Sequence, residues 1–282
     1  MNKVIIIAGS DSGGGARIQA DLKTVTALGA FGTCAITAIT AQNTLGVQNI
    51  YEIPEHIVAQ QIDSVMTDIG TDALKTGMLC NADIVKAVSN KIKQYQIKNV
   101  VVDPVIAAKG GRQLLSLDGI NALISDLIPL SFLITPNVYE AERLSGQTIK
   151  SLSDMEESAK LIHKLGAKNV LIKGGHLQVD SPSPGGRGLG RGGVIHASGT
   201  VTDVFYDGKD FAYFSSERIK TINTHGIGCT YASAIAAGLA KGNGLRESIK
   251  NAKSFITKTL KSSFNPGKGH GTLNQSGTAE SC

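Results

Sequence analysis

The chain has 282 residues, enough for one large domain with a buried core or for two small domains. Its net charge of +5 is mild and its basic residues are scattered, whereas a nucleic-acid partner would require a concentrated basic face. Hydrophobic residues make up 41%, and no apolar run approaches the length of a membrane span, so we expect no membrane partner.

The cysteines and the first apolar run both favour a cytoplasmic protein. The four cysteines lie far apart and form no CxxC pair, which predicts free thiols rather than a disulfide framework or a zinc site. The first apolar run, residues 4–8, is too short for the core of a signal peptide, and it leads into a glycine loop.

Short β-branched runs then alternate along the chain with longer segments of helical spacing. The expected strands are residues 4–8, 34–39, 73–76, 100–103, 132–135 and 170–173. The expected helices are residues 17–28, 55–67, 82–96, 119–127, 138–144 and 153–165. This alternation predicts an α/β fold, a mostly parallel central sheet with helices on both faces.

The C-terminal part has a different pattern. Asp207-Gly208 separates two apolar runs, residues 201–206 and 211–215, and is a strong hairpin signal. Two helical segments follow, residues 229–240 and 245–260. No linker divides the chain, so we expect a single domain over residues 1–274. The polar tail, residues 275–282, is predicted to fray.

One segment, residues 181–193, is rich in Gly, Pro and Arg and has no periodicity. We interpret residues 181–200 as a flexible insertion. It is either a disordered surface loop or a glycine lid in which Arg187 and Arg191 contact phosphates. The loop interpretation is favoured because glycines spaced in this way fix no geometry.

Residues that directly follow the expected strands are the first candidates for a site, because ligands bind beyond the carboxyl ends of parallel strands. Gly9 opens a glycine loop that lets the backbone approach a ligand closely. Gln42 follows the second strand, and its amide matches the ring nitrogen and amino group of an aminopyrimidine, although a plain polar loop explains it equally well. Met78 follows the third strand and is either a soft wall for a flat ring or a core residue.

The later strand ends carry charged groups. Asp103 follows the fourth strand, and Asn137 follows the fifth as a candidate helix cap. Glu140 and Glu142 are candidates to hold Mg²⁺ through water, or they are simply acidic residues in the first turn of a helix. Lys173 ends the sixth strand, where a phosphate is expected to lie.

The most informative segment is residues 223–230, which leads directly into a helix of small residues. Gly226 and Gly228 at a helix N-terminus expose backbone N–H groups toward one point, which suits a phosphoryl group that gains charge. Cys229 stands at the helix start, where its pKa is expected to fall and its thiolate can accept a hydroxyl proton. The alternative is a glycine turn beside a buried cysteine.

Together these segments resemble the hydroxymethylpyrimidine/phosphomethylpyrimidine kinases of thiamine biosynthesis, a family of the ribokinase-like superfamily. The resemblance runs in order from about residue 4 to residue 274. The matching segments are residues 8–11, 18–24, 41–44, 75–79, 102–105, 135–142, 173–176, 223–230 and 269–271.

The resemblance implies a three-layer α/β/α sandwich, usually a homodimer, which uses ATP and Mg²⁺ to phosphorylate 4-amino-5-hydroxymethyl-2-methylpyrimidine and then its monophosphate. It places Cys229, Gly226 and Gly228 at the catalytic centre. It implies substrate contacts by Gln42, Asp21, Gly9, Met78 and Val105. On the ATP side it implies Lys173, Asn137, Lys109, Thr224 and His225, with Glu140 and Asp103 at the metal through water.

Three features depart from the family pattern: Arg17 replaces a usual Gly, Ile227 replaces a usual Thr or another small residue, and the insertion lengthens a short connection. Arg17 either crowds the pocket or points to solvent. Two alternative functions therefore remain beside the pyrimidine kinase: a pyridoxal/pyridoxine kinase, and a degenerate member that binds but turns over poorly.

Overall fold

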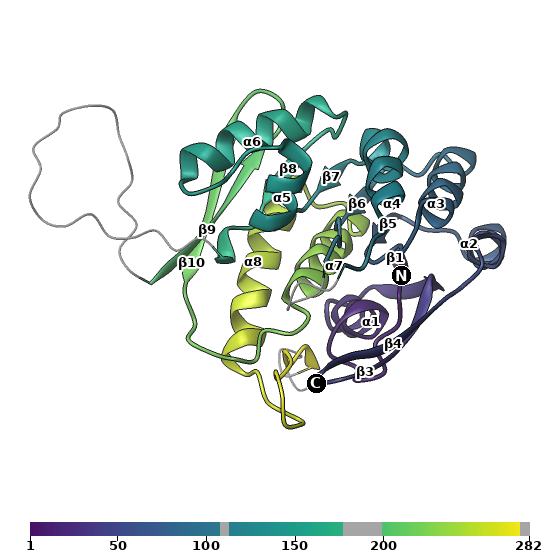
Figure 1. Ribbon diagram of the computed structural model, residues 1–282, viewed down its shortest axis with the longest axis horizontal. Helices are drawn as coiled ribbons and strands as arrows, with labels where there is room; N and C mark the ends of the chain where they lie inside the picture. Colours follow the sequence, from purple (N-terminus) through teal and green to yellow (C-terminus); the bar gives the residue numbers. More distant parts are fainter. Residues whose placement is uncertain (108–112, 177–198, 277–282) are drawn as a thin grey trace, which may run out of the picture.

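A mostly parallel sheet forms the centre of the molecule (Figure 1). The computed structural model describes residues 1–107, 113–176 and 199–276, and within these ranges eight strands join in the order β10-β9-β8-β7-β6-β5-β1-β2. Of these eight strands, β9 alone runs opposite to the others, so the predicted, mostly parallel sheet is confirmed. The strands are β1 (Lys3–Ala8), β2 (Phe31–Ile36), β5 (Ala73–Thr76), β6 (Val100–Val102), β7 (Leu133–Ile134), β8 (Val170–Ile172), β9 (Thr200–Tyr206) and β10 (Phe211–Glu217).

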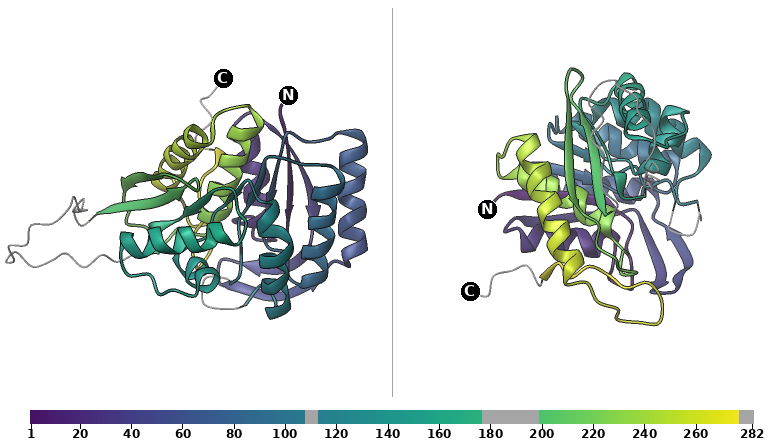
Figure 2. Two further views of the ribbon diagram at one scale, coloured as in Figure 1. Left: turned by 90° about the horizontal axis from the view of Figure 1, so that it is seen from above. Right: turned by 90° about the vertical axis from the view of Figure 1, so that its left-hand side faces the viewer.

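Helices cover both faces of this sheet, which confirms the three-layer sandwich (Figure 2). On one face lie α1 (Arg17–Ala27), α7 (Ile227–Ala240) and α8 (Leu245–Lys261). On the other lie α2 (Glu55–Asp68), α3 (Ala82–Gln94), α4 (Leu117–Ala122), α5 (Val138–Ser145) and α6 (Leu152–Lys164). The segment expected as one helix over 119–127 is instead α4 followed by a π-helical turn, Leu123–Leu127.

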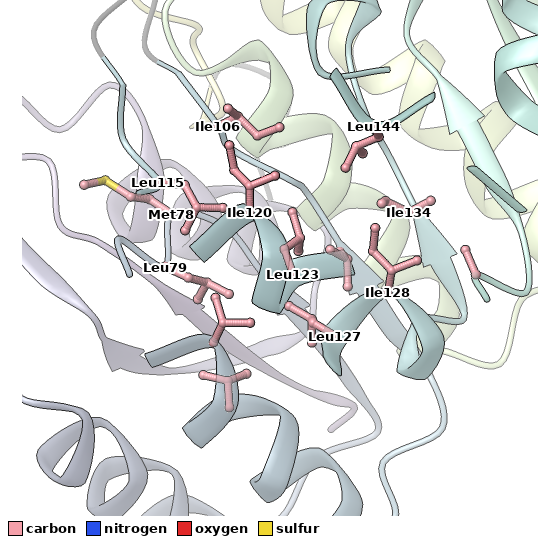
Figure 3. Close-up of a cluster of buried hydrophobic side chains, with 14 of the residues drawn as sticks. Met78, Leu79, Ile106, Leu115, Ile120, Leu123, Leu127, Ile128, Ile134 and Leu144 are labelled. Atoms are coloured by element: carbon pink, nitrogen blue, oxygen red, sulfur yellow. The ribbon is translucent and has the colours of Figure 1, made fainter. Parts of the chain in front are cut away.

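Two hydrophobic cores fill the spaces between the layers, because successive strand residues point to opposite faces. In β1, Val4 and Ile6 join the core under α7 and α8, whereas Ile5 and Ile7 join the core under α2 to α6. Figure 3 shows the second core, where Met78 and Leu79 lie with Leu123 and other side chains of the α4 region. All four named β1 residues are fully buried, so β1 is held by packing on both faces of the sheet.

The expected second strand, residues 34–39, is wrong in one respect. The chain leaves the main sheet after β2 at Thr37, whose N–H donates to Ala8 O at 3.1 Å and whose hydroxyl donates to Met78 O at 2.6 Å. It then forms β3 (Ala38–Asn43), which pairs with β4 (Gly46–Glu52) in a separate antiparallel hairpin. Gln42 therefore lies in a strand rather than in a loop.

The remaining C-terminal expectations are largely confirmed. The hairpin around Asp207-Gly208 joins β9 and β10, and Asp207 Oδ1 accepts from the N–H groups of Lys209 and Asp210 at 3.0 and 2.8 Å. The tail does not begin to fray at Gln275, because this side chain is buried and donates to Thr230 Oγ1 at 3.1 Å. Among the described residues, no helix is both long and apolar enough to cross a membrane.

Candidate active site

The start of α7 presents the backbone amides that the sequence predicts. Gly226 adopts a φ of 85°, in the left-handed region that glycine tolerates, and a Cβ at this position would collide with the carbonyl oxygen of Gly15. The first helical bond runs from Thr230 N–H to Gly226 O at 2.9 Å. The preceding amides in the first turn have no helical acceptor, and the helix dipole adds positive potential, so this turn suits an anion.

Gly228 faces an ion pair that two strand ends supply. Lys173, after β8, donates to Asp103 Oδ1 at 2.8 Å, and Asp103 directly follows β6. A Cβ on Gly228 would lie 3.3 Å from Lys173 Nζ and 3.7 Å from Asp103 Oδ2. Burial opposes the charge on Lys173, but the carboxylates of Asp103 and Glu140 outweigh it and raise the pKa of Lys173 above its usual value. A cation therefore lies beside the amides of α7.

Asn137 and Glu140 form a capping box at the start of α5. Asn137 Oδ1 accepts from Glu140 N–H at 2.9 Å, and Glu140 Oε2 accepts from Asn137 N–H at 2.8 Å. The predicted cap is confirmed, so the Asn137 amide is engaged within the helix start. Burial, with the charge of Asp103 in the same direction, raises the pKa of Glu140 from 4.5 to about 7.

The acidic residues near Lys173 match one kind of metal site. The described ranges contain no group of three or more His, Cys, Asp or Glu side chains arranged to hold a metal. Asp103 and Glu140 act on each other electrostatically across the Lys173 ammonium. Mg²⁺ that binds mainly through substrate phosphates needs only one or two carboxylates, directly or through water. This pair therefore fits Mg²⁺ delivered with a nucleotide.

Cys229 lies in the first turn of α7, half-buried, and its Sγ accepts from Arg17 N–H at 3.4 Å. The expectation of a lowered pKa is wrong. Desolvation outweighs the nearby Lys75 ammonium, and the carboxylates of Asp21 and Asp103 add to it, so the pKa of Cys229 rises to about 11. The thiol consequently holds its proton at neutral pH in this state.

Gln42 lies beside the same helix start. Its Nε2 is 3.1 Å from His225 Nε2, and this ring nitrogen is also 2.9 Å from Asp11 Oδ2. Thr40 Oγ1 donates to Gln42 Oε1 at 3.3 Å. His225 was expected on the ATP side, but its described partners are the Gln42 amide and the Asp11 carboxylate. Because His225 directly precedes Gly226, these contacts bring the predicted ring-binding amide to the predicted anion site.

Asp11 organises the glycine loop after β1. Its carboxylate accepts from the N–H groups of Gly13, Gly15 and Ala16 at 2.9, 3.2 and 2.9 Å. Burial opposes ionisation, but the hydrogen bond and charge of His225 and these amides keep the pKa of Asp11 below its usual value. The loop is therefore held against α7 by an ionised side chain.

Gly9, Met78 and Val105 lie along the ends of β1, β5 and β6. A Cβ on Gly9 would lie 3.3 Å from Met78 Sδ and 3.2 Å from Arg17 Nη1, so the Arg17 side chain points into this region rather than to solvent. Met78 is almost fully buried and belongs to the core beneath α2 to α6, which is the core alternative of its prediction. Val105 lines a small neighbouring cavity of about 10 Å³ together with Gly77 and Asp103.

Asp21 was expected to contact the substrate, and the structure places it elsewhere. Its side chain is fully buried, with 0% exposure, where it accepts from Lys75 Nζ at 2.7 Å and from Ser233 Oγ at 2.7 Å. Burial opposes the charge on Lys75, but the Asp21 carboxylate outweighs it and raises the pKa of Lys75. Asp21 therefore holds Lys75 beneath the site and joins α1 to α7.

Of the other candidates, Thr224 is half-buried and its hydroxyl donates to Ile222 O at 3.5 Å, next to His225. Lys109, Arg187 and Arg191 lie outside the described residues.

Two residues of the site escaped prediction from the sequence, although each carried a signal. Lys75 is a lone cation within a buried strand, which requires a buried partner. Asp11 is a short acid ahead of a glycine turn, and such acids commonly bond to backbone amides.

An α/β/α sandwich with a glycine-rich helix start at the carboxyl edge of its sheet defines a ribokinase-like phosphotransferase. The chain belongs to the phosphomethylpyrimidine kinase family, because the sequence model of this family matches residues 11–274. It is similar to a hydroxymethylpyrimidine/phosphomethylpyrimidine kinase of Bacillus subtilis, with 44% identity over 96% of this chain and 94% of the relative.

Two further similarities broaden the comparison. The chain is 47% identical to the bifunctional thiamine biosynthesis protein of Geobacter sulfurreducens, over 98% of its own length, and spans about half (53%) of that relative. A solved structure, the ADP complex of Bacillus subtilis pyridoxal kinase, matches with a TM-score of 0.84 and 39% identity, covering 98% of each chain. The chain is thus similar to proteins that are named for two different substrates.

Proposed function

We propose that this protein phosphorylates 4-amino-5-hydroxymethyl-2-methylpyrimidine and then its monophosphate, with ATP as the phosphoryl donor and Mg²⁺ bound to the nucleotide. The observation that carries the proposal is the contact between Gln42 and His225, because it brings the Gln42 amide, our candidate for holding the ring, next to the amides of α7. The named relatives from Bacillus subtilis and Geobacter sulfurreducens support this substrate class.

In the proposed reaction, the substrate oxygen attacks the γ-phosphorus of ATP, the bond to the bridging oxygen breaks, and ADP leaves. The amides of Gly226, Gly228 and Cys229 stabilise the negative charge that grows on the migrating phosphoryl group. Lys173 adds a positive charge on the nucleotide side. Gln42, Gly9, Met78 and Val105 hold the ring.

Cys229 is proposed to accept the hydroxyl proton of the substrate. Since the pKa of its thiol is about 11, only a small fraction is ionised at neutral pH, and that fraction grows as the pH rises. Asp103 and Glu140 would hold Mg²⁺ through water, and the metal when bound neutralises phosphate charge. Lys109, Thr224 and Asn137 complete the proposed ATP side.

One assay tests the proposal. The protein is incubated with Mg-ATP and either hydroxymethylpyrimidine, its monophosphate or pyridoxal, and ADP release is followed. ADP release with the pyrimidines supports the proposal, whereas turnover with pyridoxal alone would replace it by the second candidate, a pyridoxal kinase, which the Bacillus subtilis structural relative favours.

A third outcome, ligand binding without ADP release, would point to a degenerate member of the family. Ile227, in the first turn of α7, then becomes the residue to revert, because the family resemblance implies Thr or another small residue at this position and Ile lacks the Thr hydroxyl. Ile227→Thr should restore turnover, with the neighbouring exposed Ile222→Thr as the matched control. If Ile227→Thr does not increase turnover, Ile227 is not the cause of the low activity.

We also propose that residues 1–274 act as one kinase unit in a homodimer in the cytoplasm. Three large apolar side chains of the β3–β4 hairpin, Ile39, Leu45 and Tyr51, are 53–69% exposed, which favours a partner for this hairpin. Three described cysteines are free thiols, which favours a reducing compartment. Sedimentation would distinguish monomer from dimer, and Ile39→Lys should weaken a dimer formed through the hairpin.

A further inference from the structure

Arg17 is held in an unusual backbone conformation at the first residue of α1. Its φ is 56°, in the left-handed region that disfavours residues with a Cβ, and its side chain is nonetheless buried, with 6% relative exposure. Its backbone N–H donates to Cys229 Sγ at 3.4 Å, so the Arg17 backbone is hydrogen-bonded to the proposed catalytic thiol. An arginine that only covered the surface would need neither this backbone conformation nor this burial.

The guanidinium of Arg17 lies in the region that is proposed to hold the ring. Nη1 is next to Gly9 and Met78, at the ends of β1 and β5. Lys173 and Asp103 occupy the ends of β8 and β6, which are on the other side of β5 in the sheet order. Arg17 is therefore placed toward the pyrimidine rather than toward the proposed nucleotide side.

Within the described residues, one nitrogen of this guanidinium is left without a partner. Nη1 of Arg17 is buried and has no hydrogen-bond partner there. Burial lowers the pKa of Arg17, and the groups whose ionised forms would oppose this are Cys229, Asp11 and Cys80. Burial raises the pKa of Cys80 to about 12 and that of Cys229 to about 11, so both thiols are neutral near pH 7.

Asp11, the remaining acid, is already engaged. Its carboxylate accepts from three backbone N–H groups of the glycine loop and contacts His225 at 2.9 Å. A guanidinium that is buried without a paired anion is strongly unfavourable, and an Arg fork matches the geometry of a phosphate. An anionic ligand at this position would remove the imbalance, whereas a neutral alcohol would leave it in place.

We propose that Arg17 is a specificity-determining residue that makes this enzyme prefer a pyrimidine that already carries a phosphate over the neutral hydroxymethyl compound. The inference rests on the proposed function and deepens it. The Arg17 guanidinium donates to the substrate phosphate while Gln42 holds the ring, so the second phosphorylation is favoured over the first.

The decisive experiment measures equilibrium binding of hydroxymethylpyrimidine and of its monophosphate, without nucleotide, by calorimetry. The readout is the ratio of the two dissociation constants, because a merely structural role of Arg17 would not change it. In Arg17→Gly this ratio should fall at least about 10-fold, the size expected for a charged hydrogen bond. Arg17→Lys keeps the positive charge but loses the planar guanidinium that can donate two parallel hydrogen bonds, so it should give an intermediate ratio.

Gln96→Gly is the matched control, because Gln96 also has a left-handed φ, 51°, but is exposed after α3. It should leave the ratio unchanged. An unchanged ratio in Arg17→Gly would overturn the inference. So would weaker ATP binding in Arg17→Gly with the ratio unchanged, because Arg17 would then serve the nucleotide.

The two proposals fail in distinguishable ways. Absence of ADP release with either pyrimidine counts against the proposed function, whatever the binding ratio is. A ratio that is insensitive to Arg17 in an enzyme that turns over both pyrimidines overturns only the specificity role. If Arg17→Gly tightens both ligands equally, Arg17 is an obstruction rather than a selector, and the inference is also overturned.

Discussion

Nε2 of His225 lies 3.1 Å from Nε2 of Gln42, and the same ring nitrogen lies 2.9 Å from Asp11 Oδ2. A ring nitrogen is either a donor or an acceptor, and an amide nitrogen only donates, so His225 cannot satisfy both partners at once. If Nε2–H donates to Asp11, the ring nitrogen cannot also accept from the Gln42 amide. The protonation of His225 therefore links the Gln42 amide to the glycine loop.

Gln42→Ala tests this arrangement at the substrate. We expect KM for the pyrimidine to rise by roughly 10- to 100-fold, since a buried hydrogen bond to the ring is lost, while KM for ATP stays within about twofold. Steady-state kinetics with each substrate varied in turn gives both values. Gln48→Ala, on the exposed β4, is the control. Equal losses for both substrates would indicate a folding defect.

Cys229→Ala tests the proposed base. We expect kcat to fall by roughly 10²-fold or more, in the range of general-base losses, with little change in KM for ATP. Cys34→Ala, at a half-buried cysteine in β2, should retain full activity. A Cys229→Ala enzyme with the kcat of the unmodified protein would reduce this thiol to a packing residue.

Asp21→Asn tests whether Asp21 supports the fold rather than the substrate. Removing one partner of a buried ion pair leaves Lys75 unpaired, which should lower the free energy of unfolding by about 3–5 kcal/mol. Urea denaturation measures this change. The double variant Asp21→Leu with Lys75→Met should recover much of the loss. Full stability with a raised pyrimidine KM in Asp21→Asn would instead restore the substrate role.

Glu140→Gln tests the pH dependence of stability. Because folding raises the pKa of Glu140 from 4.5 to about 7, its stabilising contribution is fully present below pH 4.5 and is lost as the pH rises through about 7. Glu140→Gln removes this titration but keeps an acceptor for Asn137 N–H. We expect Tm of the unmodified protein, without nucleotide or Mg²⁺, to fall from pH 5 to pH 8 by more than that of the variant.

The size of the Glu140 effect is bounded by its pKa shift, at up to about 3 kcal/mol. Glu142→Gln is the natural comparison, because Glu142 lies on the same helix and its Oε1 accepts from Ile149 N–H at 2.8 Å. Parallel pH curves for the unmodified protein and Glu140→Gln would show that Glu140 ionises normally.

The local pattern of apolar residues along the chain was sufficient to predict most of the fold. The β-branched runs and the helical spacing predicted the main sheet, because strands buried on both faces must be apolar throughout. The strand β4 was missed because its residues are mostly exposed, so no apolar alternation marks it. The break at Thr37 was missed because no residue type marks it; the Thr37 hydroxyl instead donates to Met78 O, which is distant in the sequence.

By itself, the sequence determined the layered fold, the family and the glycine-rich start of α7, because each depends on periodicity or on a short contiguous motif. The tertiary structure decided which side chains reach the site. Packing buried the Asp21 side chain completely, raised the pKa of Cys229 and left the Arg17 side chain beside Gly9. Desolvation and contacts between distant segments exist only once the chain is packed, so they could not be predicted from a local sequence pattern.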